Sequence, residues 1–430
     1  MPGESVVITG IGVVSSIGLD GSSFWRSCLE GRSGAVRLDS AWITETGLST
    51  QIAAPVRGFD PVAAGIPAKQ VGLLDRVSWF ALAAAHQALT DAGLGTEPAG
   101  PRGETLVTTG VPPSRLATIV GTGIGGISTV ESSHAAWRGT RSKNSVKRYS
   151  LPMLIPNAPA GQVAIRFGAR GECKAVCTAC AAGTMAIGDA WRLIRTGEAD
   201  VVLAGGTEGF AEDEDAYGLM GFERLKTMST RNEDPSRASR PFDLKRDGFV
   251  LGEGAAMLVL ERAGHARSRG ARPYAAVSGY ASNCDATSMM QPDETGAGIV
   301  SLIRSALASA GLDPSDVRHV SAHGTSTVVN DRTEAKALRL LLGGRLDDVP
   351  VTALKSMTGH AIGASGPLET AAAALSIREG VLAPTINYEF PDPECDVDVV
   401  TRPRHVRPEV VLKLSYGFGG HNACLVLTPA

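Results

Sequence analysis

Short runs of apolar residues, many of them β-branched, end in glycine at three points in the first half of the chain. They are SVVITGIGVV at residues 5–14, LATIVGTGIGG at 116–126 and ADVVLAGGTEG at 199–209. A continuous apolar run that stops at a turn residue is typical of a strand buried on both faces of a sheet. The pattern therefore predicts three buried strands, each running into a glycine turn.

Stretches with apolar residues at helical spacing alternate with these runs. Residues 74–93 and 181–198 are predicted helices, and in the second of them Ile187, Trp191 and Ile194 share one face. The second half has the same rhythm, with predicted strands at 272–282, 317–326, 349–360 and 409–420 and predicted helices at 298–312 and 367–380. Alternating strands and helices predict an α/β protein with largely parallel sheets.

The domain organisation follows from length and from one polar segment. A chain of 430 residues is too long for one small core, so two halves are expected. The arginine-rich stretch at 262–273 is the best candidate boundary, which gives a first half of residues 1–262 and a second half of 263–430. The charged, loop-rich segment 212–248 is interpreted as an insertion in the first half.

Composition and charge exclude several classes of protein. Hydrophobic residues make up 43% of the chain and charged residues 20%, and the formal net charge is −3. This composition is typical of a globular protein, and this charge does not favour nucleic-acid binding. No basic residue precedes Arg26 and glycines interrupt the first apolar run, which argues against a signal peptide, and no apolar run approaches the length of a membrane span. We therefore expect a cytoplasmic protein with no nucleic-acid or membrane partner.

The cysteines leave four interpretations to weigh. Cys177 and Cys180 form a C-x-x-C pair, which could be a zinc clip, a redox pair, buried core or part of a nucleophilic site. No second pair of ligands with similar spacing exists, which disfavours structural zinc, and a redox pair usually opens the first helix of a small domain. We expect six of the seven cysteines to be small buried hydrophobes: Cys28, Cys173, Cys177, Cys284, Cys395 and Cys424.

Cys180 differs because it lies where a predicted strand (ECKAVCTA) meets the predicted helix at 181–198. A helix N-terminus carries unpaired N–H groups and a partial positive charge, which favour a thiolate and can also hold an oxyanion. The small residues Ala181, Ala182 and Gly183 are expected to leave the sulfur unshielded. Cys180 is therefore a candidate nucleophile, which needs partners from elsewhere in the chain.

Two histidines follow predicted strands of the second half, each beside a glycine. They are His323 in AHGTST and His360 in KSMTGH. The carboxyl ends of parallel strands form the ligand crevice of an α/β sheet, so both histidines are candidate site residues. Lys355 lies in the same segment as His360, and Glu369 begins the next predicted helix and could pair with it.

These motifs resemble those of the β-ketoacyl-[acyl-carrier-protein] synthases of the thiolase superfamily, most closely the elongating enzymes of type II fatty acid and polyketide synthesis. The resemblance is carried by TACAAG, AHGTST, KSMTGH and GFGGHNA, by VVITGIGVVSSIG and GTGIGG, and by residues 239–261, so it spans the whole chain. Related families differ. Thiolases have a second catalytic cysteine in a Cys-x-Gly context, which Cys424 lacks. Initiating ketosynthases have asparagine where this chain has His360. Chain-length-factor subunits lack the cysteine that this chain has as Cys180.

The resemblance implies a thiolase-like fold, in which two pseudo-symmetric α/β halves form a five-layered core, and a dimer. It also implies a decarboxylative Claisen condensation with no metal or organic cofactor, because decarboxylation itself generates the carbon nucleophile. Cys180 would carry the acyl chain, and His323 and His360 would stabilise the enolate. Lys355 and Glu369 would hold the histidines. The N–H groups of Cys180 and Phe418 would form the oxyanion hole, with Phe418 also a gate, and Thr325 and Thr327 would contact the pantetheine arm.

Finer features resemble ketosynthase subunits of bacterial type II polyketide systems, although TACAAG, GASGPLE and His421 depart from that pattern. The resemblance leaves three product classes open (polyene, aromatic polyketide or fatty acid), and two dimer partners, a second copy or a chain-length-factor-like subunit. A non-catalytic scaffold of this fold is the alternative function, which the intact site residues disfavour.

The acidic acyl carrier protein needs a basic surface, for which residues 137–148 supply Arg138, Arg141, Lys143, Lys147 and Arg148. An incidentally charged, solvated loop is the alternative interpretation of that segment.

Overall fold

A mixed sheet of eleven strands runs through the described part of the protein, residues 4–99, 105–209 and 216–430 of a computed structural model. Its first half holds β1 (Val6–Ser15), β6 (Leu116–Gly121), β7 (Cys173–Val176), β8 (Val201–Glu208) and β10 (Gly254–Arg262). The second half holds β11 (Ala275–Cys284), β12 (His319–Ser321), β13 (Pro350–Thr352), β15 (Asp398–Val399), β17 (Val411–Gly417) and β18 (His421–Thr428).

The two halves of this sheet have the same topology. The strand order is β7-β6-β8-β10-β1 in the first half and β13-β12-β17-β18-β11 in the second, with β15 added at the outer edge. The halves meet where β1 pairs with the start of β11, at Val6–Ile8. The predicted boundary after residue 262 falls between β10 and α10 (Ala263–Ser268).

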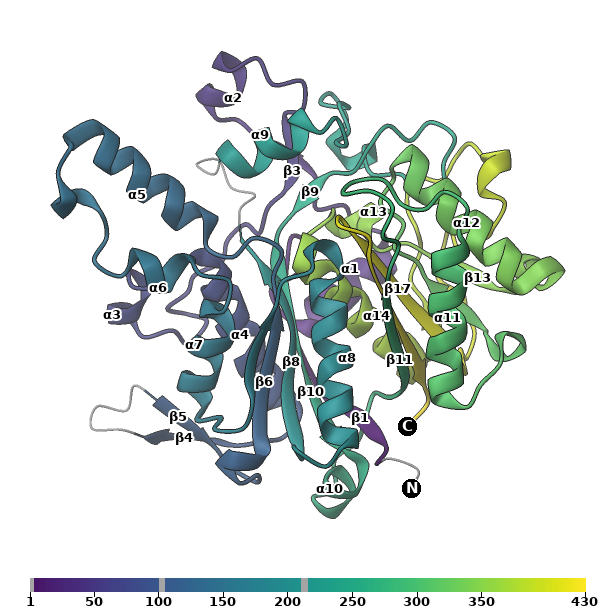
Figure 1. Ribbon diagram of the computed structural model, residues 1–430, viewed down its shortest axis with the longest axis horizontal. Helices are drawn as coiled ribbons and strands as arrows, with labels where there is room; N and C mark the ends of the chain where they lie inside the picture. Colours follow the sequence, from purple (N-terminus) through teal and green to yellow (C-terminus); the bar gives the residue numbers. More distant parts are fainter. Residues whose placement is uncertain (1–3, 100–104, 210–215) are drawn as a thin grey trace.

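Helices fill the layers between and outside the two groups of strands (Figure 1). The central layer consists of α8 (Ala182–Arg195) and α14 (Ser365–Glu379), which contact each other and both groups of strands. One outer layer contains α4 (Arg76–Asp91) and α7 (Ala158–Phe167), and the other α11 (Ala297–Ala310) and α12 (Val328–Leu342). The result is the five-layered α/β arrangement that the resemblance implied.

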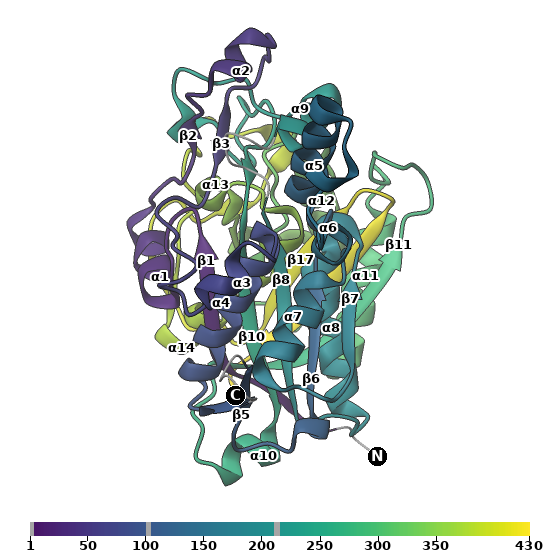
Figure 2. The ribbon, with the colours of Figure 1, turned by 90° about the vertical axis from the view of Figure 1, so that its left-hand side faces the viewer.

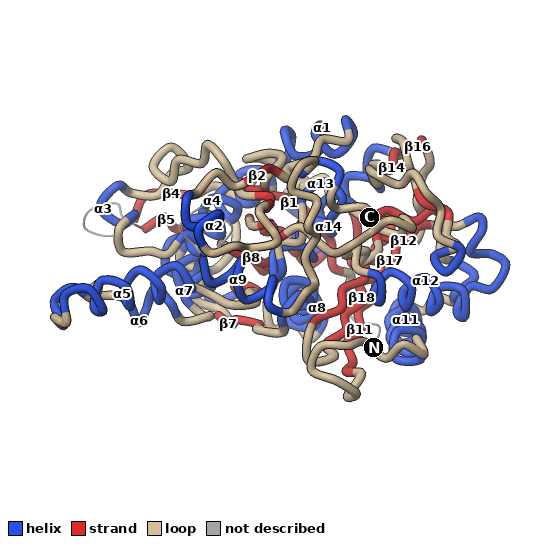
Figure 3. The backbone as a smooth tube through the Cα atoms, turned by 90° about the horizontal axis from the view of Figure 1, so that it is seen from above, coloured by secondary structure: helices blue, strands red, loops and turns tan. Residues whose placement is uncertain are grey.

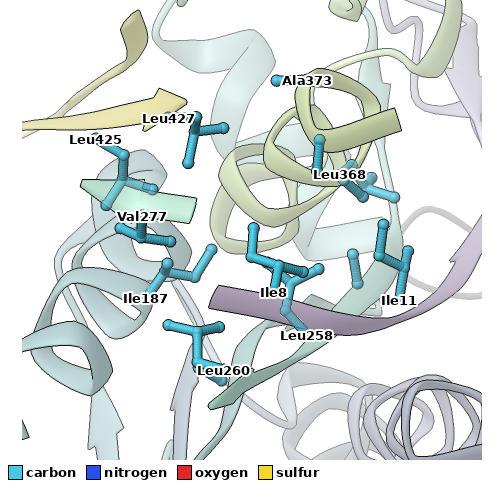
Figure 4. Close-up of a cluster of buried hydrophobic side chains, with 14 of the residues drawn as sticks. Ile8, Ile11, Ile187, Leu258, Leu260, Val277, Leu368, Ala373, Leu425 and Leu427 are labelled. Atoms are coloured by element: carbon cyan, nitrogen blue, oxygen red, sulfur yellow. The ribbon is translucent and has the colours of Figure 1, made fainter. Parts of the chain in front are cut away.

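The central layer is the largest buried apolar cluster (Figure 4). Its side chains come from the first group of strands, from both central helices and from the second group of strands: Ile8, Leu258, Leu260, Ile187, Leu368, Ala373, Val277, Leu425 and Leu427. Burial of such side chains stabilises the fold by roughly 1.5–3 kcal/mol each. Both groups of strands pack against this layer, so the two halves of the chain form one body.

The prediction of largely parallel sheets is wrong. In the first half β6, β7 and β8 are parallel to one another, but β10 lies antiparallel between β8 and β1. In the second half β12, β13 and β17 are parallel, and β18 lies antiparallel between β17 and β11. In the second half the reason is that β17 turns back directly through Gly419 and Gly420, both at positive φ, into β18, which allows only an antiparallel hairpin. The parallel strands still place their carboxyl ends together.

Smaller elements surround this body. The helices are α1 (Gly21–Glu30), α2 (Ala41–Glu45), α3 (Ala68–Val71), α5 (Ile127–Thr140), α6 (Ser150–Leu154), α9 (Ala216–Arg224) and α13 (Lys355–Thr358). The strands are β2 (Val36–Arg37), β3 (Ile52–Ala54), β9 (Leu251–Gly252), β4 (Thr96–Ala99), β5 (Thr105–Thr108), β14 (Val381–Leu382) and β16 (Arg404–His405). The 3-10 turns are η1 (Pro113–Arg115), η2 (Lys143–Ser145), η3 (Ala179–Ala181), η4 (Pro235–Arg237), η5 (Pro314–Asp316), η6 (Gly343–Asp348), η7 (Ile362–Ala364) and η8 (Pro393–Cys395).

Several of these elements lie beyond one end of the main sheet, where α2, β2 and β3 are seen at the top of Figure 2. The predicted insertion at 212–248 is described from residue 216 onward, where it forms α9, η4 and loops, and residues 212–215 lie outside the described part. Seen from above, α5 and α6 lie at the end of the molecule opposite to α11 and α12 (Figure 3).

Among the described residues, no helix has the length and apolar character needed to cross a membrane.

Candidate active site

Cys180 lies in a tight turn between a strand and a central helix. β7 ends at Val176, η3 spans Ala179–Ala181 and α8 begins at Ala182. Ala179 has a φ of +50°, a left-handed conformation that costs roughly 1–2 kcal/mol for a residue with a Cβ. The turn therefore holds the nucleophile candidate in a strained, defined position at the start of α8.

Two glycines let neighbouring segments approach this turn. A Cβ on Gly183 would lie 2.3 Å from the Gly363 carbonyl oxygen, so α8 can pack against η7 only with glycine there. A Cβ on Gly417 would lie 2.9 Å from the Thr178 carbonyl oxygen and 3.2 Å from the Cys180 nitrogen. This close approach brings the end of β17, and with it Phe418, next to Cys180.

The expectation of an unshielded, readily ionised Cys180 is wrong. The residue is 7% exposed, and burial raises the pKa of its thiol to about 12. Lys355 and the backbone N–H groups of Cys180 and Phe418 act in the opposite direction, whereas Glu208 adds to the rise. Burial outweighs the helix N-terminus because the turn is covered by β17 and η7. The two N–H groups that favour the thiolate are those expected to form the oxyanion hole.

His323 follows β12, and its backbone is clamped by α12. The N–H groups of His323 and Gly324 donate to the two oxygens of Glu334 at 2.8 and 2.9 Å. His360 lies in an isolated bridge to β9, in which its N–H donates to Val250 O at 2.7 Å, and its Nδ1 lies 3.0 Å from Ser365 Oγ. The two rings meet edge to face, with centroids 5.5 Å apart.

Lys355 connects His323 to Glu369. Its ammonium donates to Glu369 Oε1 at 2.6 Å and to the His323 carbonyl oxygen at 2.6 Å, and lies 3.3 Å from His323 Nδ1. An ammonium has no acceptor, so His323 Nδ1 accepts and the ring proton is on Nε2. Lys355 and Glu369 are each 1% exposed, so this ion pair is buried.

Both histidines are held neutral. Burial lowers the pKa of His323 and of His360 well below the usual 6.5, and Lys355 lowers both further. A neutral imidazole donates a hydrogen bond without carrying a charge, and in His323 the proton for it is on Nε2. Neutral donors of this kind are suited to a carbonyl oxygen on which negative charge develops.

A cavity of about 300 Å³ brings these side chains together. It is lined by Cys180, His323 and His360, by Phe418, which is half-buried, and by the hydroxyl-bearing Thr325 and Thr327. The Thr325 and Thr327 hydroxyl oxygens lie 2.9 Å apart. Lys355 does not line it but contacts His323 from behind, and Glu369 pairs with Lys355.

Four buried polar residues of this region escaped the sequence interpretation. Glu208, at the end of β8, accepts from Thr122 Oγ1 and from the N–H groups of Gly123, Ile124 and Gly363. Burial raises the pKa values of Glu208 and Glu334 to about 7. Tyr416 lines the cavity with its ring 5.3 Å from that of His323, and Lys413 lies behind Glu369. For Glu208, a charged residue at the end of a predicted buried strand is the signal that was available, because such a group needs a partner.

The prediction that the other six cysteines are buried is wrong for three of them. Cys28, Cys395 and Cys424 are buried, whereas Cys173, Cys177 and Cys284 are exposed. β7 is an edge strand of the sheet, so Cys173 at its start and Cys177 just after its end reach the surface. Within the part of the chain that the structure describes, no three histidine, cysteine or acidic side chains are grouped to hold a metal ion.

The basic segment at 137–148 comprises the end of α5 and the loop after it, and all five cationic side chains there are exposed: Arg138, Arg141, Lys143, Lys147 and Arg148. The Arg141 guanidinium lies over the Trp137 ring, 4.8 Å from its centroid. Figure 1 shows α5 extending away from the strands, so these charges lie apart from the residues that line the cavity.

Comparison with known proteins gives consistent matches over the whole chain. The family of beta-ketoacyl synthase N-terminal domains matches residues 3–266, and that of beta-ketoacyl synthase C-terminal domains matches residues 274–389. The 3-oxoacyl-[acyl-carrier-protein] synthase 2 of Coxiella burnetii is 39% identical over 100% of this chain and 99% of its own. The protein of the same name from Synechocystis sp. is 38% identical over 98% of this chain and 97% of its own.

Solved structures agree with these matches. A beta-ketoacyl synthase from Burkholderia phymatum superposes with a TM-score of 0.89 at 32% identity, over 99% of this chain and 100% of its own. Two others are 31% identical and cover 100% of both chains. One is the type II polyketide ketosynthase AntDE, bound to the acyl carrier protein AntF, with a TM-score of 0.86, and the other is the ishigamide ketosynthase/chain length factor, with a TM-score of 0.87.

Proposed function

The chain belongs to the beta-ketoacyl synthase family, and from this premise we propose that Cys180, His323 and His360 act as its catalytic triad. It is an acyltransferase, a ketosynthase that elongates a fatty acyl or polyketide chain by decarboxylative condensation in a type II system. One observation carries the assignment of the triad: the three side chains line one cavity, beside two backbone N–H groups that favour the Cys180 thiolate.

In the first half-reaction, Cys180 Sγ attacks the carbonyl carbon of an acyl thioester. The N–H groups of Cys180 and Phe418 hold the oxyanion that forms, and the pantetheine thiol leaves with the proton that Cys180 gives up. The acyl chain is then a thioester of Cys180. Because the N–H groups belong to a strained turn and to the end of β17, they are in place before the substrate arrives.

In the second half-reaction, a malonyl thioester enters and its carbonyl oxygen accepts hydrogen bonds from His323 Nε2 and His360 Nε2. The bond to the carboxylate breaks, carbon dioxide leaves and the two electrons remain as an enolate, which the histidines stabilise. The enolate carbon attacks the acyl carbonyl on Cys180, forms the new carbon–carbon bond and expels the thiolate, which takes up a proton. Decarboxylation supplies the carbon nucleophile, so the proposal requires no cofactor.

Other residues position these groups. Lys355, paired with Glu369, fixes both the backbone and the ring of His323. Thr325 and Thr327 are placed to hydrogen-bond the amides of a pantetheine arm that reaches into the cavity. Phe418, half-buried between Gly417 and Gly419, separates the acyl and malonyl steps by moving at the cavity wall.

We also propose that an acyl carrier protein delivers both substrates and docks on the exposed cations of residues 137–148. The carrier as partner is supported by the solved complex of AntDE with its acyl carrier protein AntF, and a chain-length-factor-like dimer partner by the ishigamide ketosynthase/chain length factor. The proposed dimer partner is a second copy of this chain or a chain-length-factor-like subunit. Co-purification from the native host, followed by mass determination of both subunits and of any bound acyl chain, distinguishes the two and identifies the product class.

The function is tested by supplying the purified dimer with an acyl carrier protein charged with an acyl group and another charged with a malonyl group. We expect carbon dioxide and an acyl chain longer by two carbons, in equal amounts. A protein that binds the carrier but releases no carbon dioxide would be a scaffold, and the catalytic proposal would fail.

A further inference from the structure

Lys413 is a fully buried lysine in the middle of β17. Its ammonium lies 2.7 Å from Glu369 Oε2 and donates to Ser415 Oγ at 2.9 Å and to the carbonyl oxygen of Leu414. The ammonium therefore donates two hydrogen bonds and forms an ion pair with Glu369. A buried cation with these partners is held in one place.

Glu369 is shared between two lysines. Lys355 contacts its Oε1 at 2.6 Å and Lys413 its Oε2 at 2.7 Å, and all three side chains are at most 1% exposed. With both lysines protonated, two cations and one anion give the cluster a net positive charge in the protein interior. That charge lies directly behind His323, which Lys355 contacts through its carbonyl oxygen and its ring.

The same lysine is tied to the nucleophile side of the cavity. Ser415 Oγ shares a hydrogen bond of 2.8 Å with Thr184 Oγ1, on the first turn of the helix that follows Cys180. β17 then continues to Phe418, at the cavity wall. Lys413 therefore joins α14, β17 and α8 through polar contacts that are all buried.

We propose that Lys413 is a second positioning lysine of the condensation site, which holds Glu369 against Lys355 and thereby keeps Lys355 on His323. The proposal rests on the proposed function, since it assigns a role within the second half-reaction. Without Lys413, one oxygen of Glu369 loses its partner, and the carboxylate is free to turn away from Lys355.

The charged and titratable groups around the two histidines come from every element packed against them: Lys355 of α13, Glu369 of α14, Glu334 of α12, Lys413 and Tyr416 of β17, and Cys180 of η3. After burial and Lys355, Lys413 contributes to the lowered pKa values of His323 and His360. Removing its charge raises both pKa values. The histidines then become protonated at a higher pH, and the acidic limb of the decarboxylation profile moves upward.

The experiment compares Lys413→Met and Lys413→Gln with the wild-type dimer. The glutamine keeps a polar side chain with N–H donors but removes the charge. For both variants we expect carbon dioxide release from malonyl carrier protein to fall about tenfold, as for a member of a coupled ion-pair network. We expect the acidic limb to move up by about one pH unit. Acylation of Cys180, measured separately by mass spectrometry, should change far less.

A matched control is Lys174→Met, which removes an exposed lysine paired with Asp189 and should alter neither the rate nor the profile. Lys413 variants that fold and keep the wild-type rate and acidic limb overturn the proposal. If neither variant folds, the wild-type profile decides: an acidic limb at or above the ordinary histidine pKa of 6.5 contradicts the proposal, and one well below it supports it. A wild-type dimer that releases no carbon dioxide refutes the proposed function instead.

Discussion

Lys355 Nζ lies 2.6 Å from the carbonyl oxygen of His323 and 3.3 Å from Nδ1 of the same residue. One ammonium therefore fixes both the backbone and the ring of His323, and it leaves the Nε2 proton for the substrate. The buried partner of Lys355, Glu369, explains how a lysine can lie inside the protein at this point. This geometry supports a role for His323 as a neutral hydrogen-bond donor that is held in position, rather than as an imidazolium that acts as a general acid.

Replacing His323 or His360 by alanine should separate the two half-reactions. Each histidine is placed as a donor to the malonyl carbonyl, so carbon dioxide release should fall by about 100-fold or more. Acylation of Cys180 should be retained to a much larger extent, because its oxyanion donors are backbone N–H groups. Stopped-time assays of carbon dioxide and of acyl-enzyme check this. His405→Ala, at an exposed histidine, is the control, and near wild-type elongation by either site variant would show that the triad is wrong.

The rate of Cys180 acylation should rise with pH without reaching a plateau up to pH 9. Burial raises the thiol pKa to about 12, so the thiolate fraction grows about tenfold for each pH unit below that value. The initial rate of acyl-enzyme formation from a small pantetheine thioester, followed by mass spectrometry between pH 6 and 9, measures this. A plateau of the acylation rate near pH 7 would contradict this, because it would mean that Lys355 and the N–H groups lower the pKa of the thiol by more than burial raises it.

Ala179→Gly should stabilise the protein. The left-handed φ of +50° costs alanine more than the extra chain entropy that glycine brings to the unfolded state, so we expect a gain of about 0.5–1 kcal/mol in the free energy of unfolding. Denaturant titration measures it. Ala182→Gly, three residues along at a helical φ of −55°, is the matched control and should destabilise by about 1 kcal/mol. A loss of stability in Ala179→Gly would mean that packing of the Ala179 methyl group outweighs the strain.

Reversing Arg141, Lys143 and Lys147 to glutamate should raise the KM for acyl carrier protein. These exposed cations are proposed to steer an acidic carrier, so the effect should be largest at low salt. Turnover of a small pantetheine thioester, which needs no docking, should change little. Equal losses on both substrates would assign the segment to the fold or the dimer instead.

The sequence predicted those parts of the fold that depend on local pattern. The apolar runs at 5–14, 116–126 and 199–209 correspond to β1, β6 and β8, and the amphipathic stretch at 181–198 to α8. The antiparallel return of β10 and β18 was missed, because apolar runs mark strands but not their direction. Sheet direction is set by how the chain reconnects, which depends on contacts between distant residues.

The candidate site was predictable where chemistry coincides with a strand end, as at Cys180, His323 and His360. The burial of Cys180 could not be predicted. The helix N-terminus beside it is a local feature of the sequence, whereas β17 and η7, which cover it, are segments more than 170 residues away. Lys413 was missed for a similar reason. In VVLKLSYG a lysine among apolar residues suits an exposed strand face equally well, and only the central position of β17 makes it buried.

The covalent intermediate tests the central claim most directly. The wild-type protein is incubated with an acyl-charged carrier protein, digested and analysed by fragmentation mass spectrometry, before and after malonyl carrier protein is added. The account predicts one acyl group on Cys180, which disappears as a product two carbons longer forms. Cys177→Ala, at the exposed neighbouring cysteine, should retain both signals, and Cys180→Ala should lose both. An acyl group on Cys177, or elongation by Cys180→Ala, would contradict the account.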